Sequence, residues 1–191
     1  MSTPLLKQDI YATPEEYLCG ERVSQTKHEY LAGVIYAMAG ASRDHNLITM
    51  NLVGELRNQL RGKKCAPFGS DMRMRIRKPA GTFYYYPDVT VDCSDRNVQE
   101  VEEPSVIFEV LSPDTERADR GDKLVNYQSL PSMRAYVLVD QYRAAVTVFR
   151  RGVGDEWAME FMGDIAATLE LPEIDCRIPI ASIYERVLPV G

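Results

Sequence analysis

The sequence predicts an α/β (α+β) fold in which a central mixed β-sheet is flanked by helices. Two observations lead to this prediction. A long amphipathic helix is followed by three strand patterns, a second helix and a further strand, the order of a sheet covered on both sides. The segment PSVIFEVLS, residues 104–112, is apolar on both of its alternating faces, as a central strand is. With 191 residues, 45% of them hydrophobic, the chain is expected to form a single domain over residues 1–191.

The first third of the chain predicts a short helix, a hairpin and a long helix. Pro14 opens the short helix in TPEEYLCGERV, with Thr13 as its N-cap. The segment HEYLAGVIYAMAG indicates a hairpin or a bent strand around Gly33. Ser42 then caps a helix of about 18 residues, whose apolar side chains recur on one face at Ile48, Leu52, Leu56 and Leu60.

The rest of the chain is rich in strands. After Gly62, the segments DMRMRIR, PDVTVDC and PSVIFEVLS predict three strands in quick succession. The stretch SPDTERADRGDKLVNYQSLP predicts a loop that leads into a helix stopping at Pro131. Further strands are predicted in RAYVLVD, AVTVFRR, WAMEFMG and the region around RIPI, and a short last helix in ASIYERV.

The composition favours a soluble cytoplasmic protein. The longest run of apolar and glycine residues, Leu31–Ala41, is far shorter than the roughly 20 residues of a membrane-spanning helix. The start, MSTPLLKQDIY, lacks the charged and apolar regions of a signal peptide. The four cysteines are far apart and form no CxxC pair. We therefore expect free thiols in a reducing cytoplasm, with neither a zinc site nor a disulfide framework, at Cys19, Cys65, Cys93 and Cys176.

Charge is distributed unevenly along the chain. The formal net charge of -6 argues mildly against a protein that coats nucleic acid. Between Arg57 and Lys78, however, eight residues are basic and only Asp71 is acidic, whereas the stretch from Asp95 to Asp122 is acidic. A basic face on an acidic protein is compatible with weak or transient contact with nucleic acid.

One predicted strand concentrates basic side chains. Arginines alternate with apolar residues in DMRMRIR, so one face carries Arg73, Arg75 and Arg77 and the other carries Met72, Met74 and Ile76. The arginine face is either an ordinary solvent-facing surface or a surface that contacts phosphates. The sequence leaves both interpretations open.

Two carboxylates interrupt otherwise apolar strands. Glu109 lies in PSVIFEVLS, where a charged side chain loses its hydration unless it is paired or bound to a metal. Asp88 comes 21 residues earlier, in YYYPDVTVDC. Because neighbouring strands are about 4.8 Å apart, both can converge on one cation, with the backbone carbonyl of Val110 as a third oxygen. Such ligands suit Mg²⁺ or Mn²⁺. Alternatively, Glu109 is a core carboxylate paired with an arginine, and Asp88 simply ends a turn.

The order of these motifs resembles a known group of nucleases. The combination of PD at Pro87–Asp88, EVLSP, D-x-x-x-K-x-x-x-Y and YVLVD is similar to the PD-(D/E)xK nuclease superfamily. Within it, the chain resembles a branch of proposed bacterial restriction endonucleases long grouped as a domain of unknown function. The resemblance spans nearly the whole chain. It implies a restriction-endonuclease-like core, a Mg²⁺ or Mn²⁺ cofactor, DNA as the substrate, and a homodimer that places two sites on a duplex.

The chain departs from the superfamily pattern at one catalytic position. The pattern has a lysine two residues after the second acid, but Leu111 stands there. In the branch that this chain resembles, the lysine has moved to the following helix, where Lys123 matches it. Asp119, Lys123 and Tyr127 are four residues apart and so share one helix face. An ordinary helical ion pair between Asp119 and Lys123 is the alternative interpretation.

Several other residues are candidates for accessory roles. His45 lies on the same helix face as Ile48 and Leu52, so it is either a satisfied core residue or a residue that borders the site and contacts phosphate. Glu29 matches an acid that recurs in the branch that the chain resembles. The three tyrosines Tyr84 to Tyr86 are expected to pack in a strand, with base stacking as a minor alternative.

The mechanism implied by the resemblance is metal-assisted hydrolysis of a phosphodiester. Asp88 and Glu109 would fix the cation, and Lys123 would orient the attacking water or stabilise the developing charge. The rival class is a non-catalytic module that keeps the nuclease fold to bind DNA or a protein. A third possibility is the hydrolysis of RNA or a nucleotide at the same site. Dependence on a divalent cation separates the enzyme from the binding module.

Overall fold

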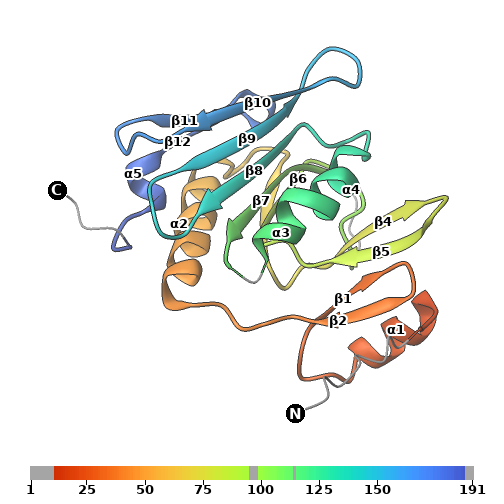
Figure 1. Cartoon of the computed structure of the whole chain (residues 1–191). Coiled ribbons are helices and arrows are strands. Elements are labelled where there is room, and N and C mark those ends of the chain that lie inside the picture. The colour runs from red at the N-terminus through yellow and green to blue at the C-terminus, as the bar shows by residue number, and fades with distance from the viewer. Residues whose placement is uncertain (1–10, 95–98, 114, 188–191) are drawn as a thin grey trace, which may run out of the picture.

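A six-stranded mixed sheet forms the centre of the molecule. The computed structural model describes residues 11–94, 99–113 and 115–187. The strand order of this sheet is β10-β9-β8-β7-β6-β3, in which β7 and β8 are parallel and the other neighbours antiparallel. Its strands are β3 (Ala66–Gly69), β6 (Val89–Asp92), β7 (Pro104–Leu111), β8 (Ala135–Asp140), β9 (Val146–Arg151) and β10 (Trp157–Met162). The predicted fold class, a mixed sheet flanked by helices, is confirmed (Figure 1).

A second, four-stranded sheet corrects the predicted strand order. Its order is β2-β1-β5-β4, from β1 (His28–Leu31), β2 (Val34–Ala37), β4 (Met74–Lys78) and β5 (Gly81–Tyr85). The strand predicted in DMRMRIR is β4, so it does not belong to the central sheet. The place beside β6 is taken by β3, the segment APFG. Its proline and glycine weaken the strand signal, and β3 was not predicted. For β5, the prediction covered only the strand packing expected of Tyr84 to Tyr86. The hairpin around Gly33 is confirmed.

One face of the central sheet packs against the long helix. The helix α2 (Arg43–Gln59) begins after Ser42, whose hydroxyl accepts a hydrogen bond from the backbone N–H of His45. Its predicted apolar stripe is buried. The same cluster includes α5 (Ile180–Ile183) and the pair β11 (Thr168–Leu171) and β12 (Cys176–Pro179), which a 3-10 turn (Pro172–Ile174) joins. The short helix α1 (Pro14–Glu21) carries the predicted cap at Thr13.

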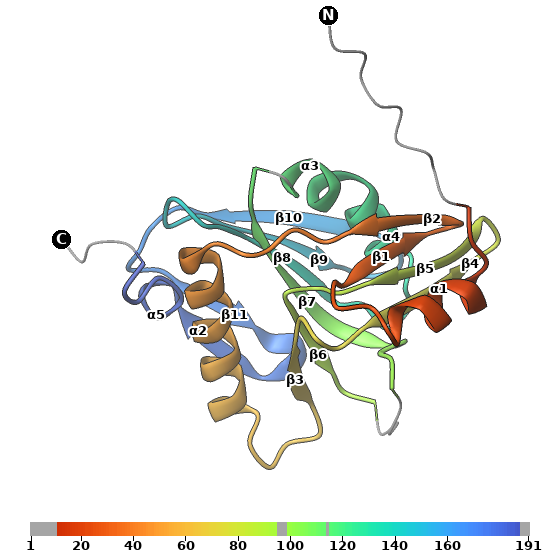
Figure 2. The same cartoon turned by 90° about the horizontal axis from the view of Figure 1, so that it is seen from below.

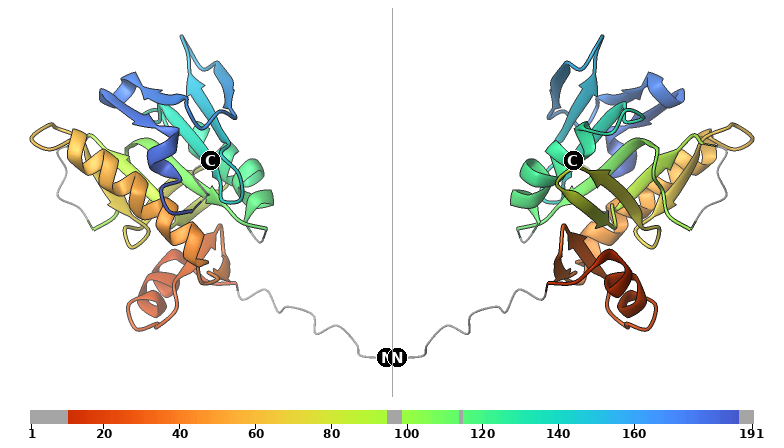
Figure 3. Two further views of the ribbon diagram at one scale, coloured as in Figure 1. Left: turned by 90° about the vertical axis from the view of Figure 1, so that its left-hand side faces the viewer. Right: turned by 90° about the vertical axis from the view of Figure 1, so that its right-hand side faces the viewer.

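The opposite face packs against a helix with an unusual middle turn (Figure 3). This helix consists of α3 (Glu116–Ala118), a π-helical turn (Asp119–Lys123) and α4 (Leu124–Gln128). The turn carries Lys123, and single π-helical turns are frequent at functional sites. Residues of β4 and β5, such as Met74 and Tyr85, share the hydrophobic cluster on this face.

The cysteine prediction is wrong for two of the four residues. Cys65 and Cys93 form a disulfide, whereas Cys19 and Cys176 are free. Cys65 directly precedes β3 and Cys93 directly follows β6, and the antiparallel pairing of Ala66 with Asp92 brings the two thiols together. Their separation of 28 residues conceals this proximity in the sequence.

No helix in the described ranges is long and apolar enough to cross a membrane. Residues 1–10, on which the signal-peptide expectation rests, lie outside the described residues.

Candidate active site

Asp88 and Glu109 meet at one end of two inner strands of the central sheet, where β6 begins and β7 ends. Val89 pairs with Phe108, so Asp88 and Glu109 are opposite one another on neighbouring antiparallel strands. The Asp88 N–H donates to Glu109 Oε2 at 3.3 Å, and Asp88 Oδ2 accepts from the Val110 N–H at 2.7 Å. The start of α2, the hairpin β1–β2 and the helix α3 surround this end of the strands, as Figure 2 shows from below. β6 and β7 are thus neighbours, which is the condition for the predicted convergence of Asp88 and Glu109.

Lys123 joins carboxylates from three separate elements. Its Nζ lies 3.1 Å from Glu109 Oε1 on β7 and 3.2 Å from Glu29 Oε1 on β1. The third carboxylate is Asp119, on the same π-helical turn, at 3.1 Å. The partner of Glu109 is therefore a lysine and not the arginine considered from the sequence. The ion pair between Asp119 and Lys123 also exists, but it is part of a larger buried cluster.

Three tyrosines lie around the cluster of Lys123 and its carboxylates. Tyr127 donates its hydroxyl proton to Glu109 Oε1 at 3.0 Å, which agrees with the predicted shared helix face. Tyr136 donates to the Asp119 backbone carbonyl at 3.1 Å, and the ring of Tyr85 lies 5.9 Å from Lys123 Nζ. Sequence reasoning gave neither Tyr85 nor Tyr136 a role at the site. Tyr84, Tyr85 and Tyr86 are all buried, which agrees with packing and leaves no open ring face for a base.

Burial and mutual charge shift the pKa values in opposite ways for the two partners. Burial raises the pKa of Glu109 well above its ordinary value, and the Lys123 ammonium opposes this shift. Burial alone would lower the pKa of Lys123, but the carboxylates of Glu109, Glu29 and Asp119 together raise it well above its ordinary value. An ammonium group in this position can stabilise negative charge or orient a water molecule.

His45 borders the site on the side away from Lys123. Its Nε2 lies 3.2 Å from Asp88 Oδ2, and its side chain is partly buried. Burial lowers the pKa of His45, but the hydrogen bond and the charge of Asp88, with the Val110 backbone, raise it overall. Of the two interpretations of His45, this contact favours the residue that borders the site.

The residues present fit a divalent cation. Asp88, Glu109 and the Val110 carbonyl offer only oxygen atoms, the ligand type that Mg²⁺ and Mn²⁺ take. When all four carboxylates are ionised, they outnumber the two basic groups, Lys123 and His45, and a cation would balance the surplus negative charge.

Two further observations bear on this fit. Within the described ranges, the buried oxygens Glu29 Oε1 and Asp119 Oδ1 have the Lys123 ammonium, at 3.2 and 3.1 Å, as their one polar neighbour. There, too, no three His, Cys, Asp or Glu side chains converge on a point where they could hold a metal. Water and substrate phosphate would therefore complete the coordination, as is usual for Mg²⁺.

The arginines of β4 are paired elsewhere. Arg73 contacts Glu100 at 2.5 Å, Arg75 contacts Glu100 at 3.1 Å and also Glu102, and Arg77 lies 3.5 Å from Glu102. The Arg77 side chain is 62% exposed, against 18% for Arg73 and 23% for Arg75. The acidic stretch noted in the sequence thus neutralises most of the basic strand, and Arg77 is the arginine of this strand most open to a phosphate.

The sequence matches one protein family over most of its length. The Uma2 family, described as "Putative restriction endonuclease", matches residues 14–179. The chain is 34% identical over 175 residues to the uncharacterized protein slr1290 of Synechocystis sp., with 90% of each chain covered. It is 35% identical over 161 residues to the uncharacterized protein sll1609 of the same organism, with 81% of this chain and 89% of that protein covered.

A solved structure shares the fold. The crystal structure of a "putative nuclease belonging to DUF820" from Anabaena variabilis superposes with a TM-score of 0.72 and 18% sequence identity. The superposition covers 93% of this chain and 99% of that chain. At this identity the similarity establishes the fold, including the central mixed sheet that carries the acidic cluster.

Proposed function

Because the chain belongs to the Uma2 family, we propose that it is a nuclease that hydrolyses phosphodiester bonds of DNA with the help of Mg²⁺ or Mn²⁺. The observation that carries this proposal is the register of β6 and β7, which sets Asp88 opposite Glu109 beside the buried Lys123. Two strand carboxylates with an adjacent ammonium form a suitable arrangement for metal-assisted hydrolysis.

Each residue has a separate proposed role. Asp88, Glu109 and the Val110 carbonyl would hold the ion, which supplies Lewis acidity at the phosphate and makes water more acidic. The Val110 N–H fixes the Asp88 carboxylate, and the Tyr127 hydroxyl fixes that of Glu109. Lys123 orients the attacking water or stabilises charge that develops on the phosphate. His45 donates to a phosphate oxygen from the other side of Asp88, and Glu29 and Asp119 hold Lys123 in place.

The position of Lys123 supports a catalytic rather than a purely structural role for the cluster that it forms with its carboxylates. Leu111, at the usual lysine position, is buried on the same strand face as Glu109. Lys123 approaches that carboxylate from the π-helical turn instead and reaches it at 3.1 Å. The ammonium group that the superfamily pattern requires is thus supplied beside the second acid by another element.

The main alternative is a module that keeps the fold to bind DNA or a protein without cleaving it. The surplus of carboxylates argues against it, because a binding module gains nothing from a buried charge imbalance that a cation must relieve. A second alternative is the hydrolysis of RNA or a nucleotide, which would use the same site on a different substrate.

A cleavage assay tests the proposed function. Supercoiled plasmid, single-stranded DNA and RNA of matched length are incubated with the protein in Mg²⁺, in Mn²⁺ and in EDTA. We expect cleavage of DNA that requires the cation and stops in EDTA. Binding of DNA without cleavage under every condition would instead favour the binding module.

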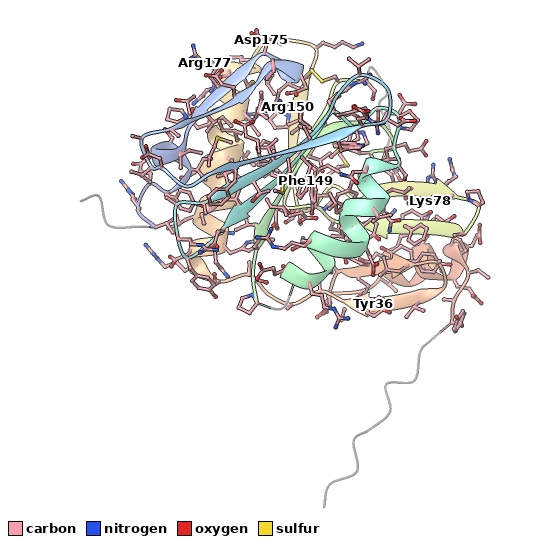
Figure 4. The ribbon with its side chains drawn as sticks, turned by 45° about the horizontal axis from the view of Figure 1, so that its top comes forward. Tyr36, Lys78, Phe149, Arg150, Asp175 and Arg177 are labelled. Atoms are coloured by element: carbon pink, nitrogen blue, oxygen red, sulfur yellow. A yellow bond between two sulfur atoms is a disulfide. The ribbon has the colours of Figure 1, made fainter. Side chains whose placement is uncertain are left out.

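The homodimer that the family resemblance implies is also a proposal, and β10 is the surface that we propose for it. No described residue pairs with the outer edge of β10, where Met159 is 67% and Phe161 63% exposed. Both side chains lie on the sheet face of Phe149, which is opposite Met159 in the register and lies beside α4 (Figure 4). Exposed apolar edge strands tend to pair with another chain.

The sequence of β10 is complementary to a second copy of itself. In an antiparallel pairing centred on Met159, Trp157 would lie opposite the partner's Phe161. Glu160 would lie opposite the partner's Ala158, so the two glutamates would not oppose each other. Aromatic cross-strand pairs stabilise a sheet, whereas like charges directly opposite destabilise it.

A further inference from the structure

A cavity of about 510 Å³ lies between α2 and the segment that joins β3 to β4. The helix contributes Asn46, Thr49 and Met50 to the lining, β3 contributes Phe68, and the joining segment contributes Met72. Figure 2 shows α2 running beside β3 at the edge of the sheet that carries the candidate active site. None of the roles proposed above uses this cavity.

Both walls of the cavity are adjacent to the candidate site. On the helix, Asn46 follows His45, whose imidazole is 3.2 Å from the Asp88 carboxylate. On the sheet, Gly69 lines the cavity and pairs with Val89, the residue that follows Asp88. A phosphate held at Asp88 would therefore have one of its own nucleotides beside the opening of the cavity.

The lining chemistry suits an uncharged planar ring. Phe68 lines the cavity with its aromatic side chain partly packed against the hydrophobic cluster on the α4 side, Met50 and Met72 offer thioethers, and the amide of Asn46 can pair with a hydrogen-bonding edge. Within the described ranges the only charged side chain in the lining is Asp71, which is almost fully exposed and pairs with Lys27 at 3.0 Å. The Lys27 ammonium contacts Ser70 and Asp71 at the rim of the cavity and is neutralised there by the Asp71 carboxylate.

We propose that this cavity binds a nucleobase of the nucleotide next to the scissile phosphate. The inference rests on the proposed nuclease function and names the form of its substrate. A base can enter the cavity only after leaving the duplex stack, which is easiest where the base is already unpaired. Single-stranded DNA, or an unpaired segment, is therefore the preferred substrate over intact duplex. Stacking on an aromatic ring tolerates different bases, so the sequence preference is weak.

Gly69 allows the cavity to be filled without disturbing the fold. A Cβ placed on Gly69 meets no atom within 4 Å, and the residue has no positive φ. Gly69→Val therefore projects a side chain into the cavity, and valine is favourable in a strand. Gly54→Val is the matched control, because a Cβ at Gly54 also meets nothing within 4 Å and Gly54 is exposed on α2 outside the lining.

The test measures binding of the intact protein to a fluorescent single strand by anisotropy, with Ca²⁺ occupying the carboxylate site in place of Mg²⁺. We expect Gly69→Val to weaken binding about tenfold, as loss of one stacked base does, and Gly54→Val to bind like the wild type. Replacing the successive bases of the strand by abasic sites, one at a time, should identify one position that weakens wild-type binding by a similar factor. An abasic site at that position should not weaken the binding of Gly69→Val any further.

Three results would overturn the inference, and they are distinguishable. Equal affinities for Gly69→Val and Gly54→Val, from a wild type that cleaves DNA with Mg²⁺, would remove the base pocket and leave the nuclease function intact. A wild type that neither binds nor cleaves any DNA would remove both. Preference for an intact duplex over the single strand would also contradict the inference.

Discussion

Lys123 carries the positive charge on which three carboxylates depend, those of the buried Glu109 and Asp119 and of the partly buried Glu29. Removing one partner from a buried ion pair leaves an uncompensated charge and costs about 3–5 kcal/mol. We expect Lys123→Ala to lower the free energy of unfolding by this amount in EDTA, as measured by urea denaturation. Mn²⁺ should restore part of the loss, because it would supply positive charge to the same carboxylates.

The same substitution tests the catalytic role of the lysine. At a temperature where Lys123→Ala is folded, its turnover should fall at least about a hundredfold, while Mn²⁺ affinity stays equal or rises. Lys63→Ala, which removes only a surface pair with Asp175, is the control. Adding Leu111→Lys to Lys123→Ala restores the usual superfamily spacing and should recover some activity. Equal turnover of Lys123→Ala and the wild type would exclude the assignment.

Asp88 provides a test of metal binding that does not require catalysis. A cation that binds only the folded protein stabilises it by about 2.7 kcal/mol at a hundredfold excess over its Kd. Mn²⁺ should therefore raise the melting temperature of the wild type, and Asp88→Asn should abolish that shift. A shift of equal size in Asp88→Asn would place the cation elsewhere.

At the scale of elements, ion pairs on β4 reduce the number of its arginines that can contact a phosphate. Arg73 and Arg75 are tied to Glu100 and Glu102, which leaves Arg77 as the exposed arginine. Each lost phosphate contact lowers the slope of log affinity against log salt by about 0.9 on duplex DNA. We expect Arg77→Ala to reduce the slope by this amount at most, and replacement of all three arginines to reduce it no further. A threefold larger change would show that all three contact phosphates.

Local patterns predicted the elements that carry the site. Alternation and apolar runs predicted β6 and β7, the strands beside which Asp88 and Glu109 come together, because these signals lie within each segment itself. The cap at Ser42 and the apolar stripe of α2 are likewise local, so they could be read directly from the chain.

Contacts between distant segments could not be predicted in this way. Glu29 reaches Lys123 only because β1 pairs with β5 in the second sheet, a pairing that no local pattern specifies. The Cys65–Cys93 disulfide depends in the same way on the pairing of β3 with β6. The π-helical turn leaves no signal in the spacing of Asp119 and Lys123, since both helix types bring these side chains together.

At the scale of the whole molecule, the two sheets share one hydrophobic cluster. Met74 and Tyr85 of the second sheet pack with Ile107 and Tyr136 of the central sheet. Lys123 also joins the two sheets, through Glu29 and Glu109. We propose that they form a single domain, as expected from the length of the chain.

The proposed dimer can be followed through the only tryptophan, Trp157, which lies on β10. Light scattering and sedimentation should give a dimer for the wild type, and dilution should shift the Trp157 emission as the strand becomes exposed. Phe161→Lys should give a monomer, because a charge would be buried in the interface. Val153→Lys, at a fully exposed turn, is the control. A monomeric wild type at all concentrations would exclude the β10 interface.

The most direct test of the central claim compares DNA cleavage by two carboxylate variants. Asp88→Asn removes a proposed metal ligand, whereas Asp92→Asn alters the far end of the same strand, where the carboxylate accepts hydrogen bonds from Ser94. In Mg²⁺ we predict that Asp88→Asn cleaves single-stranded DNA at least about a hundredfold more slowly than the wild type. Asp92→Asn should cleave at a rate close to that of the wild type. Cleavage by Asp88→Asn at the wild-type rate, or wild-type cleavage that persists in EDTA, would contradict the account.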